Sequence, residues 1–382
     1  MFEHTPGQAI RDAFCLSSGV YFLSHSVGRP LRSAQGALQE AFLEPWQGDG
    51  DSFPEVWDCW LRVLDDFRAA LALLFNSAPE GFCPQVNLSS AVSKIVMSLD
   101  VLRRPGAVVL MSEIDFPSMG FALRQALPES CELRFIPETE NIADPQVWEN
   151  ALTSDVCLAF VSRAYSNTGQ LAPWADLFSV ARDRGILTVL DVAQSAGVIP
   201  LDLRSLAPTF LVGSSVKWLC GGPGAGFLWV NPGQIEHCHP RDVGWFSHQT
   251  PFEMDIHHFE YHPDALRFLG GTPSIAPFAI AGPSIRYFAE LGSQTVYQYN
   301  QKCIDQILSV VGESVVSPLD PKLRSGTCVL HFGPKQEKAI QLLRRKNIAS
   351  DVRKAGIRIS PHVYNHPQDL DFLLQTFKTI LA

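Results

Sequence analysis

The sequence lacks the cysteine spacing of a zinc ribbon or a thioredoxin-like redox motif, since its nine cysteines are scattered and never occur as C-x-x-C. An odd number of dispersed cysteines is also not typical of a secreted disulfide scaffold. His237, Cys238 and His239 are adjacent, but neighbouring residues of one short segment rarely all face one ion, so no metal site is expected there. The cysteines predict reduced thiols in the cytoplasm.

Long apolar runs and basic clusters are also absent. No uninterrupted apolar stretch approaches membrane-spanning length, and the first residues, MFEHTPGQAIRDAF, show no basic segment followed by an apolar run. The net charge of −9 and the dispersed Lys and Arg residues argue against a nucleic-acid surface. We therefore expect neither a secretory signal, nor a membrane span, nor nucleic-acid binding.

A dinucleotide fingerprint is missing as well. The glycine-rich segment Gly221-Gly222-Pro223-Gly224-Ala225-Gly226 does not follow the G-x-G-x-x-G spacing, and it leads into an apolar run typical of a strand. These glycines are instead expected to allow a tight backbone turn.

The length of 382 residues, with 46% hydrophobic and 18% charged residues, predicts a folded protein of roughly two domains. Helical and strand patterns alternate, which predicts an α/β fold with a parallel sheet. Asp191 ends the apolar run that begins at Ile186, and Lys217 follows the run from Phe210 to Val212. Ligands gather at the carboxyl ends of parallel strands, so this carboxylate and this amine are expected to face one ligand.

Pyridoxal 5′-phosphate (PLP) is a cofactor that needs such a pair. It forms a Schiff base with a lysine, and an acidic partner keeps its ring nitrogen protonated. We therefore predict that Lys217 binds PLP covalently and later acts as a base, while Asp191 contacts the ring nitrogen.

An ordered motif surrounds these two residues. It resembles the class V aminotransferase group of fold-type-I PLP enzymes, to which kynureninases, cysteine desulfurases and selenocysteine lyases belong. The resemblance implies a three-layer α/β/α large domain with a mostly parallel sheet, expected at 45–260, and a smaller α+β domain formed by 1–44 and 261–382. It also implies a homodimer with active sites at the interface. The matching residues are Asp191, Ala193, Gln194, Gly197, Pro200, Leu201, Asp202, Leu203, Ser214 and Lys217.

The same resemblance implies further cofactor contacts. Hydroxyl groups at a helix start would bind the phosphate, although an ordinary serine helix cap is the alternative there. An aromatic ring in the F-P-S segment would stack on the cofactor, a glutamine would bond its phenolic oxygen, and a G-T-P segment would reach the phosphate in the partner subunit. The residues at these positions are Ser89, Ser90, Phe116, Gln194, Ser214, Ser215, Gly271 and Thr272.

Substrate contacts are implied in the same way. Arg358, in the closing motif G-I-R-I-S-P-H, is expected to form a bidentate pair with the substrate carboxylate. His25 and Trp245 are candidates for the substrate pocket, with a turn histidine as the alternative for His25. Either Ser166 or Asn167 is expected to lie near the cofactor ring.

Two departures from kynureninases bear on the reaction. Met119 stands where kynureninases usually have Asp, and Val216 stands where they have the Tyr that precedes the lysine. Cysteine desulfurases need a mobile cysteine before the terminal arginine, and none lies between Leu330 and Arg358. We therefore predict a PLP-dependent enzyme that acts on an amino acid or related amine through an external aldimine and an α-carbanion. The favoured reaction is kynureninase-like or C–S lyase-like cleavage at the β-carbon. Transamination and PLP binding without turnover are the alternatives.

Overall fold

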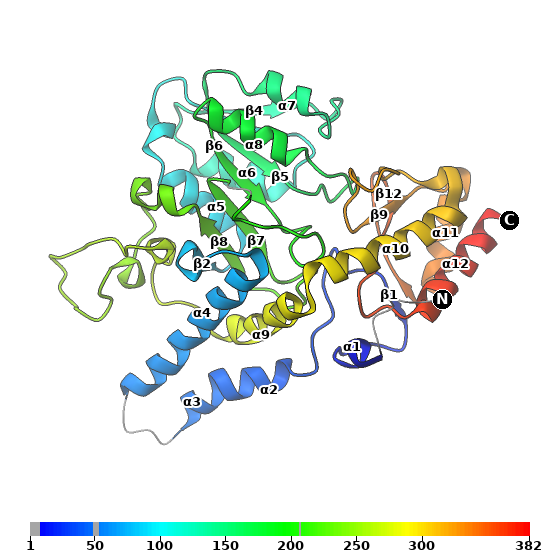
Figure 1. Cartoon of the computed structure of the whole chain (residues 1–382), viewed down its shortest axis with the longest axis horizontal. Helices are drawn as coiled ribbons and strands as arrows, with labels where there is room; N and C mark the ends of the chain where they lie inside the picture. The colour runs from blue at the N-terminus through cyan, green and yellow to red at the C-terminus, as the bar shows by residue number, and fades with distance from the viewer. Residues whose placement is uncertain (1–7, 49–52, 206–207) are drawn as a thin grey trace.

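The computed structural model describes residues 8–48, 53–205 and 208–382, as helices, strands and the segments between them. Within these ranges no helix is both long enough and apolar enough to span a bilayer. Figure 1 shows a larger α/β part and a smaller part that contains both ends of the described chain.

A seven-stranded sheet forms the centre of the larger part, in the order β2-β8-β7-β6-β5-β3-β4. Neighbours from β7 to β4 are parallel, whereas β8 runs antiparallel to both β7 and β2. The predicted α/β fold with a mostly parallel sheet is confirmed. The strands are β2 (Phe82–Gln85), β3 (Val108–Ser112), β4 (Glu132–Ile136), β5 (Val156–Ser162), β6 (Leu187–Asp191), β7 (Phe210–Ser214) and β8 (Gly226–Val230).

Helices cover both faces of this sheet because alternate strand residues point to opposite sides. Val109, Leu158 and Val189 pack in one apolar cluster with α5 (Leu88–Met97) and α6 (Pro117–Ala126). The residues next to them pack in the second cluster with α4 (Phe53–Phe75), α7 (Pro145–Ala151), α8 (Trp174–Asp183) and α9 (Ala276–Leu291). This is the three-layer arrangement expected of the large domain.

The smaller part is built on an antiparallel sheet of β11 (Asp351–Arg353), β12 (Gly356–Ile359) and β9 (Cys328–Leu330). A separate parallel pair joins β1 (Val20–Tyr21) to β10 (Ile348–Ala349), which brings the N-terminal segment to the C-terminal third. The helices of this part are α10 (Ser293–Val311), α11 (Gln336–Arg345) and α12 (Pro367–Leu381).

Shorter elements connect these parts. They are α1 (Gln8–Asp12), α2 (Ala34–Leu38), the π-helical η1 (Gln39–Leu43), α3 (Glu44–Gln47) and the 3₁₀ turns η2 (Pro79–Gly81), η3 (Asp100–Arg103), η4 (Pro232–His237), η5 (Trp245–Ser247), η6 (Ala265–Phe268), η7 (Gly312–Ser314) and η8 (Gly333–Lys335).

Some element boundaries differ from the sequence patterns. The helix expected to start at Ala91 begins three residues earlier, because the Asn87 side chain caps it by accepting a hydrogen bond from the Ser90 backbone N–H at 2.9 Å. The alternative of a serine cap at this helix is therefore wrong. The helix expected from Leu171 starts only at Trp174, directly after Pro173.

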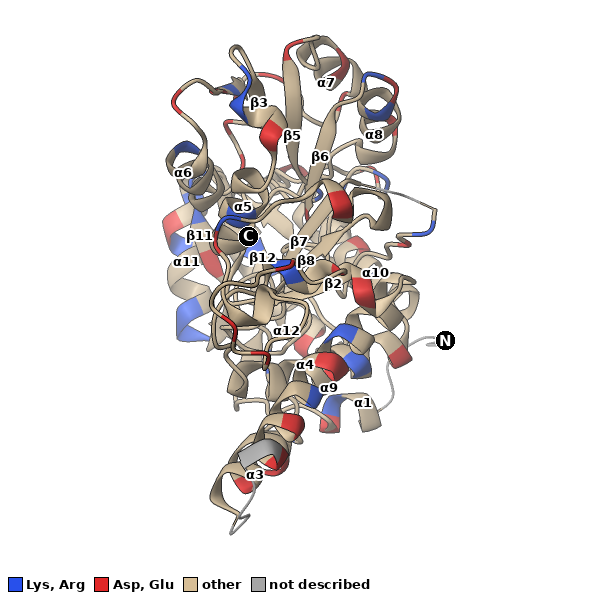
Figure 2. Cartoon of the chain, turned by 90° about the vertical axis from the view of Figure 1, so that its left-hand side faces the viewer, with Lys and Arg blue, Asp and Glu red and all other residues tan. Residues whose placement is uncertain are grey.

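Charged residues are mixed on the face drawn in Figure 2, where acidic and basic segments alternate along the helices and loops. Such an arrangement does not concentrate positive potential on this face, in keeping with the net charge of −9.

The packing of α4 on α9 generates a stability prediction. Phe67 is fully buried, and its ring packs edge-on against Phe278 with centroids 4.8 Å apart. We expect Phe67→Ala to lower the free energy of unfolding by about 3–5 kcal/mol, because it removes a large buried ring and leaves a cavity. Leu73→Ala, on the same helix but 54% exposed, is the matched control and should change it by less than about 0.5 kcal/mol. Urea denaturation measures both, and equal losses would contradict this account of the interface.

Candidate active site

A cavity of about 220 Å³ lies at the carboxyl ends of the parallel strands. Strand ends, the start of α5 and the loop after β7 all contribute to its wall. Its lining consists of Asn87, Leu88, Ser89, Ile114, Phe116, Ser118, Met119, Ser162, Ala164, Tyr165, Ser166, Asp191, Ala193, Gln194, Ser214, Val216 and Lys217. The structure therefore brings the two central predicted residues, Asp191 and Lys217, into one cavity.

Asp191 is the last residue of β6, and its side chain is held at the cavity edge. The carboxylate accepts a hydrogen bond from the Ala193 backbone N–H at 2.7 Å. Burial raises the pKa of Asp191 above its ordinary value, although the nearby Lys217 amine opposes that shift. A buried carboxylate of this kind interacts strongly with any cationic group placed in the cavity.

Lys217 lies in the loop after β7, and its amine faces the same cavity. Burial lowers the pKa of this amine, while the carboxylate of Asp191 raises it. The Nζ atom is 5.9 Å from the centroid of the Phe116 ring. A lysine with a lowered pKa supplies more of the neutral amine that nucleophilic and basic chemistry requires.

The N-terminal segment fixes the backbone of the lysine loop. The backbone N–H of Gly28 donates to the Val216 carbonyl at 2.8 Å. A Cβ atom at Gly28 would lie 2.1 Å from the Lys217 carbonyl oxygen, so only glycine allows this approach. Gly28 of the N-terminal segment thus lies directly against the backbone of the loop that carries Lys217.

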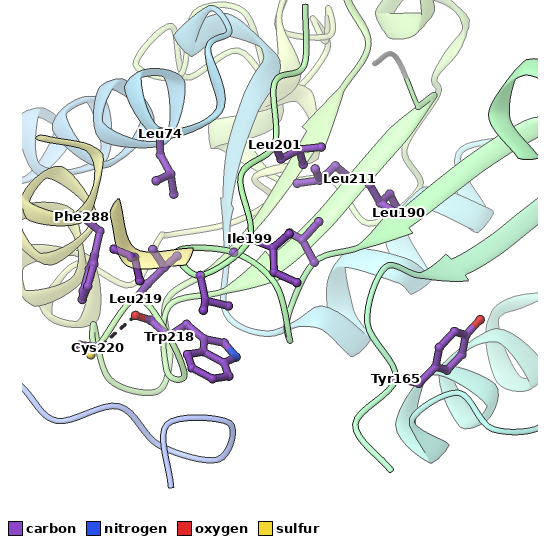
Figure 3. Packing of buried hydrophobic residues seen from close by; sticks show 14 of the residues in the cluster. Leu74, Tyr165, Leu190, Ile199, Leu201, Leu211, Trp218, Leu219, Cys220 and Phe288 are labelled. Atoms are coloured by element: carbon purple, nitrogen blue, oxygen red, sulfur yellow. Dashed lines mark hydrogen bonds between the residues drawn. The ribbon is translucent and has the colours of Figure 1, made fainter. Parts of the chain in front are cut away.

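The residues after Lys217 anchor the loop in the core. Trp218, Leu219 and Cys220 are buried, and Figure 3 shows their side chains among apolar neighbours that include Ile199 and Phe288. The Trp218 ring also stacks on His362 with centroids 5.7 Å apart, and His362 Nε2 contacts the Trp218 carbonyl at 2.9 Å. The lysine is therefore presented by a loop with little freedom to move.

Several other predicted cofactor residues line the cavity: Ser89, Phe116, Gln194 and Ser214. The amide of Gln194 donates from Nε2 to the His25 carbonyl at 3.1 Å, while its buried Oε1 atom has no hydrogen-bond partner among the described residues. The Tyr165 hydroxyl is likewise buried without a partner in that part of the chain. Buried polar atoms of this kind are normally satisfied, so the wall has unused hydrogen-bonding capacity.

Other predicted cofactor residues lie away from the cavity. The Ser215 hydroxyl donates to the carbonyls of Ala225 at 2.8 Å and Gly222 at 3.1 Å, so it supports the turn instead of lining the cavity. Ser90, Gly271 and Thr272 line an adjoining depression instead. Their expected contact with a phosphate, in the partner subunit for Gly271 and Thr272, stays a prediction.

The predicted substrate residues Arg358 and His25 meet at a carboxylate that we did not anticipate. Arg358 forms a bidentate ion pair with Asp351, through Nε at 2.7 Å and through Nη2. His25 Nε2 lies 2.9 Å from the same carboxylate, and Nδ1 lies 2.5 Å from the Ser360 hydroxyl. The Arg358 guanidinium also donates from Nη1 to the Ser166 carbonyl at 3.0 Å.

The remaining candidates differ in whether they line the cavity. Ser166 lines the cavity, whereas Asn167 does not, which favours Ser166 of these two alternatives. Trp245 packs against Trp57 and Phe252, each with ring centroids 5.4 Å away, and its Nε1 donates to Thr272 at 3.3 Å. The structure of one chain therefore does not bring Trp245 to the cavity.

Histidines and acids gather elsewhere in one cluster that could hold a metal ion. Ligand atoms of His248, Glu253 and His258 lie within 4.8 Å of one another. Each imidazole already has a hydrogen bond to Glu253, at 3.0 and 2.9 Å, which accounts for the cluster without an ion.

Asp351, Asn87 and Tyr165 are functional candidates that sequence reasoning missed. Asp351 is placed by strand register, and the turn residues Lys354 and Ala355 are not a pair typical of two-residue hairpins, so the sequence did not indicate its partner. Asn87 directly precedes a helix, which is a signal for a cap. No sequence signal distinguishes Tyr165 from an ordinary core tyrosine.

Comparisons with known proteins give consistent results. A family model described as aminotransferase class-V matches residues 86–373. Isopenicillin N epimerase from Streptomyces clavuligerus is 30% identical over 333 residues, covering 81% of this chain and 83% of that protein. Kynureninase from Burkholderia mallei is 26% identical over 318 residues, covering 80% of this chain and 74% of that protein.

Solved structures share the fold. The cystine C–S lyase C-DES, in complex with its product cysteine persulfide, superposes with a TM-score of 0.85 at 20% identity, covering 95% of this chain and 98% of that one. A C-DES mutant with glycine covalently linked to its PLP cofactor has a TM-score of 0.84 at 20% identity, covering 95% and 97%. Apo cysteine desulfurase from Thermococcus onnurineus has a TM-score of 0.86 at 18% identity, covering 100% and 99%.

Asp115, in the loop after β3, generates a pH prediction. Burial raises the pKa of Asp115 to about 7, and one of its carboxylate oxygens accepts the Ser112 N–H at 2.9 Å. Below about pH 4 the Asp115 carboxyl group is protonated in both the folded and the unfolded state. Between about pH 4 and pH 7 only the folded state keeps this proton, so rising pH favours the unfolded state. The free energy of unfolding should therefore fall by roughly 2–4 kcal/mol across this interval because of Asp115.

Asp115→Asn should remove this share of the pH dependence, since an amide does not titrate. Urea denaturation at pH values from 4 to 8 measures the difference from the wild type. Asp371→Asn, at an exposed position of α12, is the control and should keep the wild-type slope. A slope unchanged in Asp115→Asn would contradict the assignment.

Proposed function

The chain belongs to the aminotransferase class-V family and is a PLP-dependent enzyme, and from this premise we propose that it cleaves the substituent from the β-carbon of an amino acid in the manner of a C–S lyase. One observation carries the proposal. Asp191, which is buried, and Lys217, which is partly buried, lie on one cavity whose lining contains a single further titratable group, Tyr165.

The cavity wall fits PLP. The unpartnered Oε1 atom of Gln194 and hydroxyl of Tyr165 offer hydrogen bonds that the protein itself does not use. The start of α5 supplies free backbone N–H groups and the Ser89 hydroxyl, a combination suited to a phosphate. We propose that Lys217 binds the cofactor covalently, Asp191 its ring nitrogen, the second N–H of the Gln194 amide its phenolic oxygen, Ser89 and Ser214 its phosphate, and the Phe116 ring its face.

PLP, when bound, supplies an electron sink for the negative charge that develops at the α-carbon of the substrate. Asp191 would keep the ring nitrogen of the cofactor protonated. For this, the Asp191 side chain must itself remain an ionised carboxylate next to the cationic ring. The Lys217 amine takes the α-proton, because its lowered pKa keeps a share of it neutral. Lys217 therefore acts both as covalent anchor and as base.

The rest of the cavity favours elimination over hydrolysis. A kynureninase must activate water against a carbonyl group, and this requires a further acid or base. Here Met119 and Val216 line the cavity at the two positions where kynureninases have Asp and Tyr. Burial raises the pKa of Tyr165 well above its ordinary value, so Tyr165 stays protonated and cannot act as a base. A thiolate, by contrast, leaves without strong acid assistance.

Persulfide chemistry of the desulfurase type is not part of the proposal. Cys328 is buried within β9, and burial raises the pKa of its thiol to about 12. A nucleophilic cysteine needs the thiolate form and access to the substrate. Cys328 has neither.

We also propose a homodimer that operates in the cytoplasm. Gly271 and Thr272 lie outside the cavity and close to Ser90, an arrangement that suits a contribution to the partner subunit's phosphate site. All nine cysteines are unpaired, which favours a reducing compartment. Size-exclusion chromatography with light scattering tests the dimer.

A substrate panel tests the proposed reaction. The purified holoenzyme should convert an S-substituted L-cysteine and water into a thiol, pyruvate and ammonia, with no second substrate required. Alanine and anthranilate formed from kynurenine would instead establish a kynureninase. A keto acid formed only when a second keto acid is added would establish an aminotransferase, and interconversion of enantiomers without cleavage would establish an epimerase. Any of these three as the dominant reaction contradicts the proposal.

Lys217→Ala should abolish covalent attachment of PLP and lower the rate by about 10²–10⁴-fold, because both anchor and base are lost. Borohydride reduction followed by mass spectrometry should find PLP on the peptide containing Lys217 in the wild type and not in the variant. Lys302→Ala, in helix α10 of the smaller part, is the control and should retain both. Unchanged turnover in Lys217→Ala would reject the assigned role.

A further inference from the structure

Asp351 and Arg358 are paired by the geometry of a β-hairpin. Strands β11 and β12 are antiparallel, and their register sets Asp351 directly opposite Arg358 and Arg353 opposite Gly356, with two residues in the turn. Side chains directly opposite on adjacent strands lie close enough to interact. The ion pair is thus fixed by the backbone and does not depend on a chance side-chain conformation.

Most of the hydrogen-bonding capacity of Arg358 is already in use. A guanidinium carries five N–H donors. Asp351 takes the edge formed by Nε and Nη2, and the Ser166 carbonyl takes one N–H of Nη1. Two donors remain, one each on Nη1 and Nη2. The carbonyl that binds Nη1 belongs to Ser166, a residue of the cavity wall, so the guanidinium lies next to the cavity although Arg358 is not part of its lining.

The charge of Arg358 is also largely compensated. A carboxylate only accepts hydrogen bonds, so His25 Nε2 must donate to Asp351. Burial lowers the pKa of His25, which favours the neutral ring, and Nδ1 then accepts from the Ser360 hydroxyl. The Thr327 hydroxyl in turn contacts Ser360 at 2.9 Å. Arg353, 3.5 Å from the same carboxylate, is about half exposed and weakly coupled.

A substrate carboxylate that reaches Arg358 therefore meets a neutralised guanidinium with a second carboxylate on the neighbouring edge. Its attraction to Arg358 is opposed by repulsion from Asp351 at a distance of a few ångströms, in partly buried surroundings where charges are poorly screened. We propose, building on the proposed function, that Asp351 is a positioning residue that weakens the hold of Arg358 on the substrate carboxylate. It thereby widens the substrate class to amines that lack this group.

Two small probes isolate the carboxylate. L-alanine has no leaving group on its β-carbon, and ethylamine is the same molecule without the carboxylate. Titration of each into the holoenzyme, followed by the change in visible absorbance of the cofactor, gives two dissociation constants and their ratio. Asp351→Asn should increase the preference for L-alanine over ethylamine by about tenfold or more, since it removes one negative charge next to the carboxylate site. The affinity for ethylamine should stay at the wild-type value.

Matched variants show whether the effect passes through Arg358. Asp351→Glu keeps the charge and should keep the wild-type preference. Arg358→Gln should abolish the preference for L-alanine, and adding Asp351→Asn to it should change the preference less than in the wild type, because only the direct charge repulsion is then left to relieve. A purely structural role for Asp351 would instead weaken the binding of both probes.

A preference that is unchanged or reduced in Asp351→Asn overturns the proposal. Thermal melting establishes whether this variant folds, and Asp351→Ser, which removes the same charge with a smaller side chain, replaces it if it does not. If neither amine perturbs the wild-type holoenzyme, the proposed function fails first. If both bind and only the expected change in preference is missing, the function stands and the role of Asp351 is rejected.

Discussion

The register of the central parallel strands is the constraint on which the cavity depends. Ser162 at the end of β5 is paired with Asp191 at the end of β6, and Asp191 is paired with Val212 near the end of β7. Three chain segments therefore leave the sheet at the same edge. They carry Asp191, Lys217 and most other polar groups of the cavity wall, whereas Asn87, Ser89 and Ser118 come from the starts of α5 and α6. The backbone hydrogen bonds of the sheet thus hold the buried carboxylate of Asp191 next to the loop that carries Lys217, at the cost of partly desolvating both charges.

The charges around the cavity form two neighbouring pairs. Asp191 and Lys217 share one, and Asp351 and Arg358 share the other. The two are coupled, since Arg358 helps to lower the pKa of Lys217. Because Asp351 compensates the charge of Arg358, it also reduces the effect of Arg358 on the pKa of Lys217. The pair proposed to contact the substrate and the pair proposed to transfer the proton are consequently parts of one electrostatic system.

The residues that the sequence predicted well are those on short apolar runs. Asp191, Lys217 and Gln194 follow directly from strand ends, and the parallel sheet follows from the alternation of patterns. Ser215 does not line the cavity, unlike Ser214 directly before it, and its expected contact with the phosphate stays a prediction. The pairing of Asp351 with Arg358 was not predicted, because it depends on the hairpin register between two strands that are only three and four residues long. Such short strands carry almost no periodic signal.

Another group of predictions depends on contacts beyond one chain. Gly271 and Thr272 lie outside the cavity, and their expected role involves a second subunit, which no single-chain pattern can locate. Trp245, a candidate for the substrate pocket, also lies outside the cavity. The domain boundaries at 45 and 260 also stay predictions. Helix α9, expected in the small domain, packs along α4 on the large sheet. A helix such as α9, which the sequence assigns to one domain and the packing to the other, can displace a predicted domain boundary by its whole length.

The pairing of β1 with β10 has a consequence for the order in which parts of the chain fold during translation. The segment that seats Gly28 on the lysine loop is translated first, yet its docking strand, Val20–Tyr21, must wait for Ile348–Ala349. The central sheet can form before those residues emerge, since domains tend to fold as units during synthesis. The contact of Gly28 with the loop that carries Lys217 is therefore completed only near the end of translation, later than the sheet from which that loop emerges.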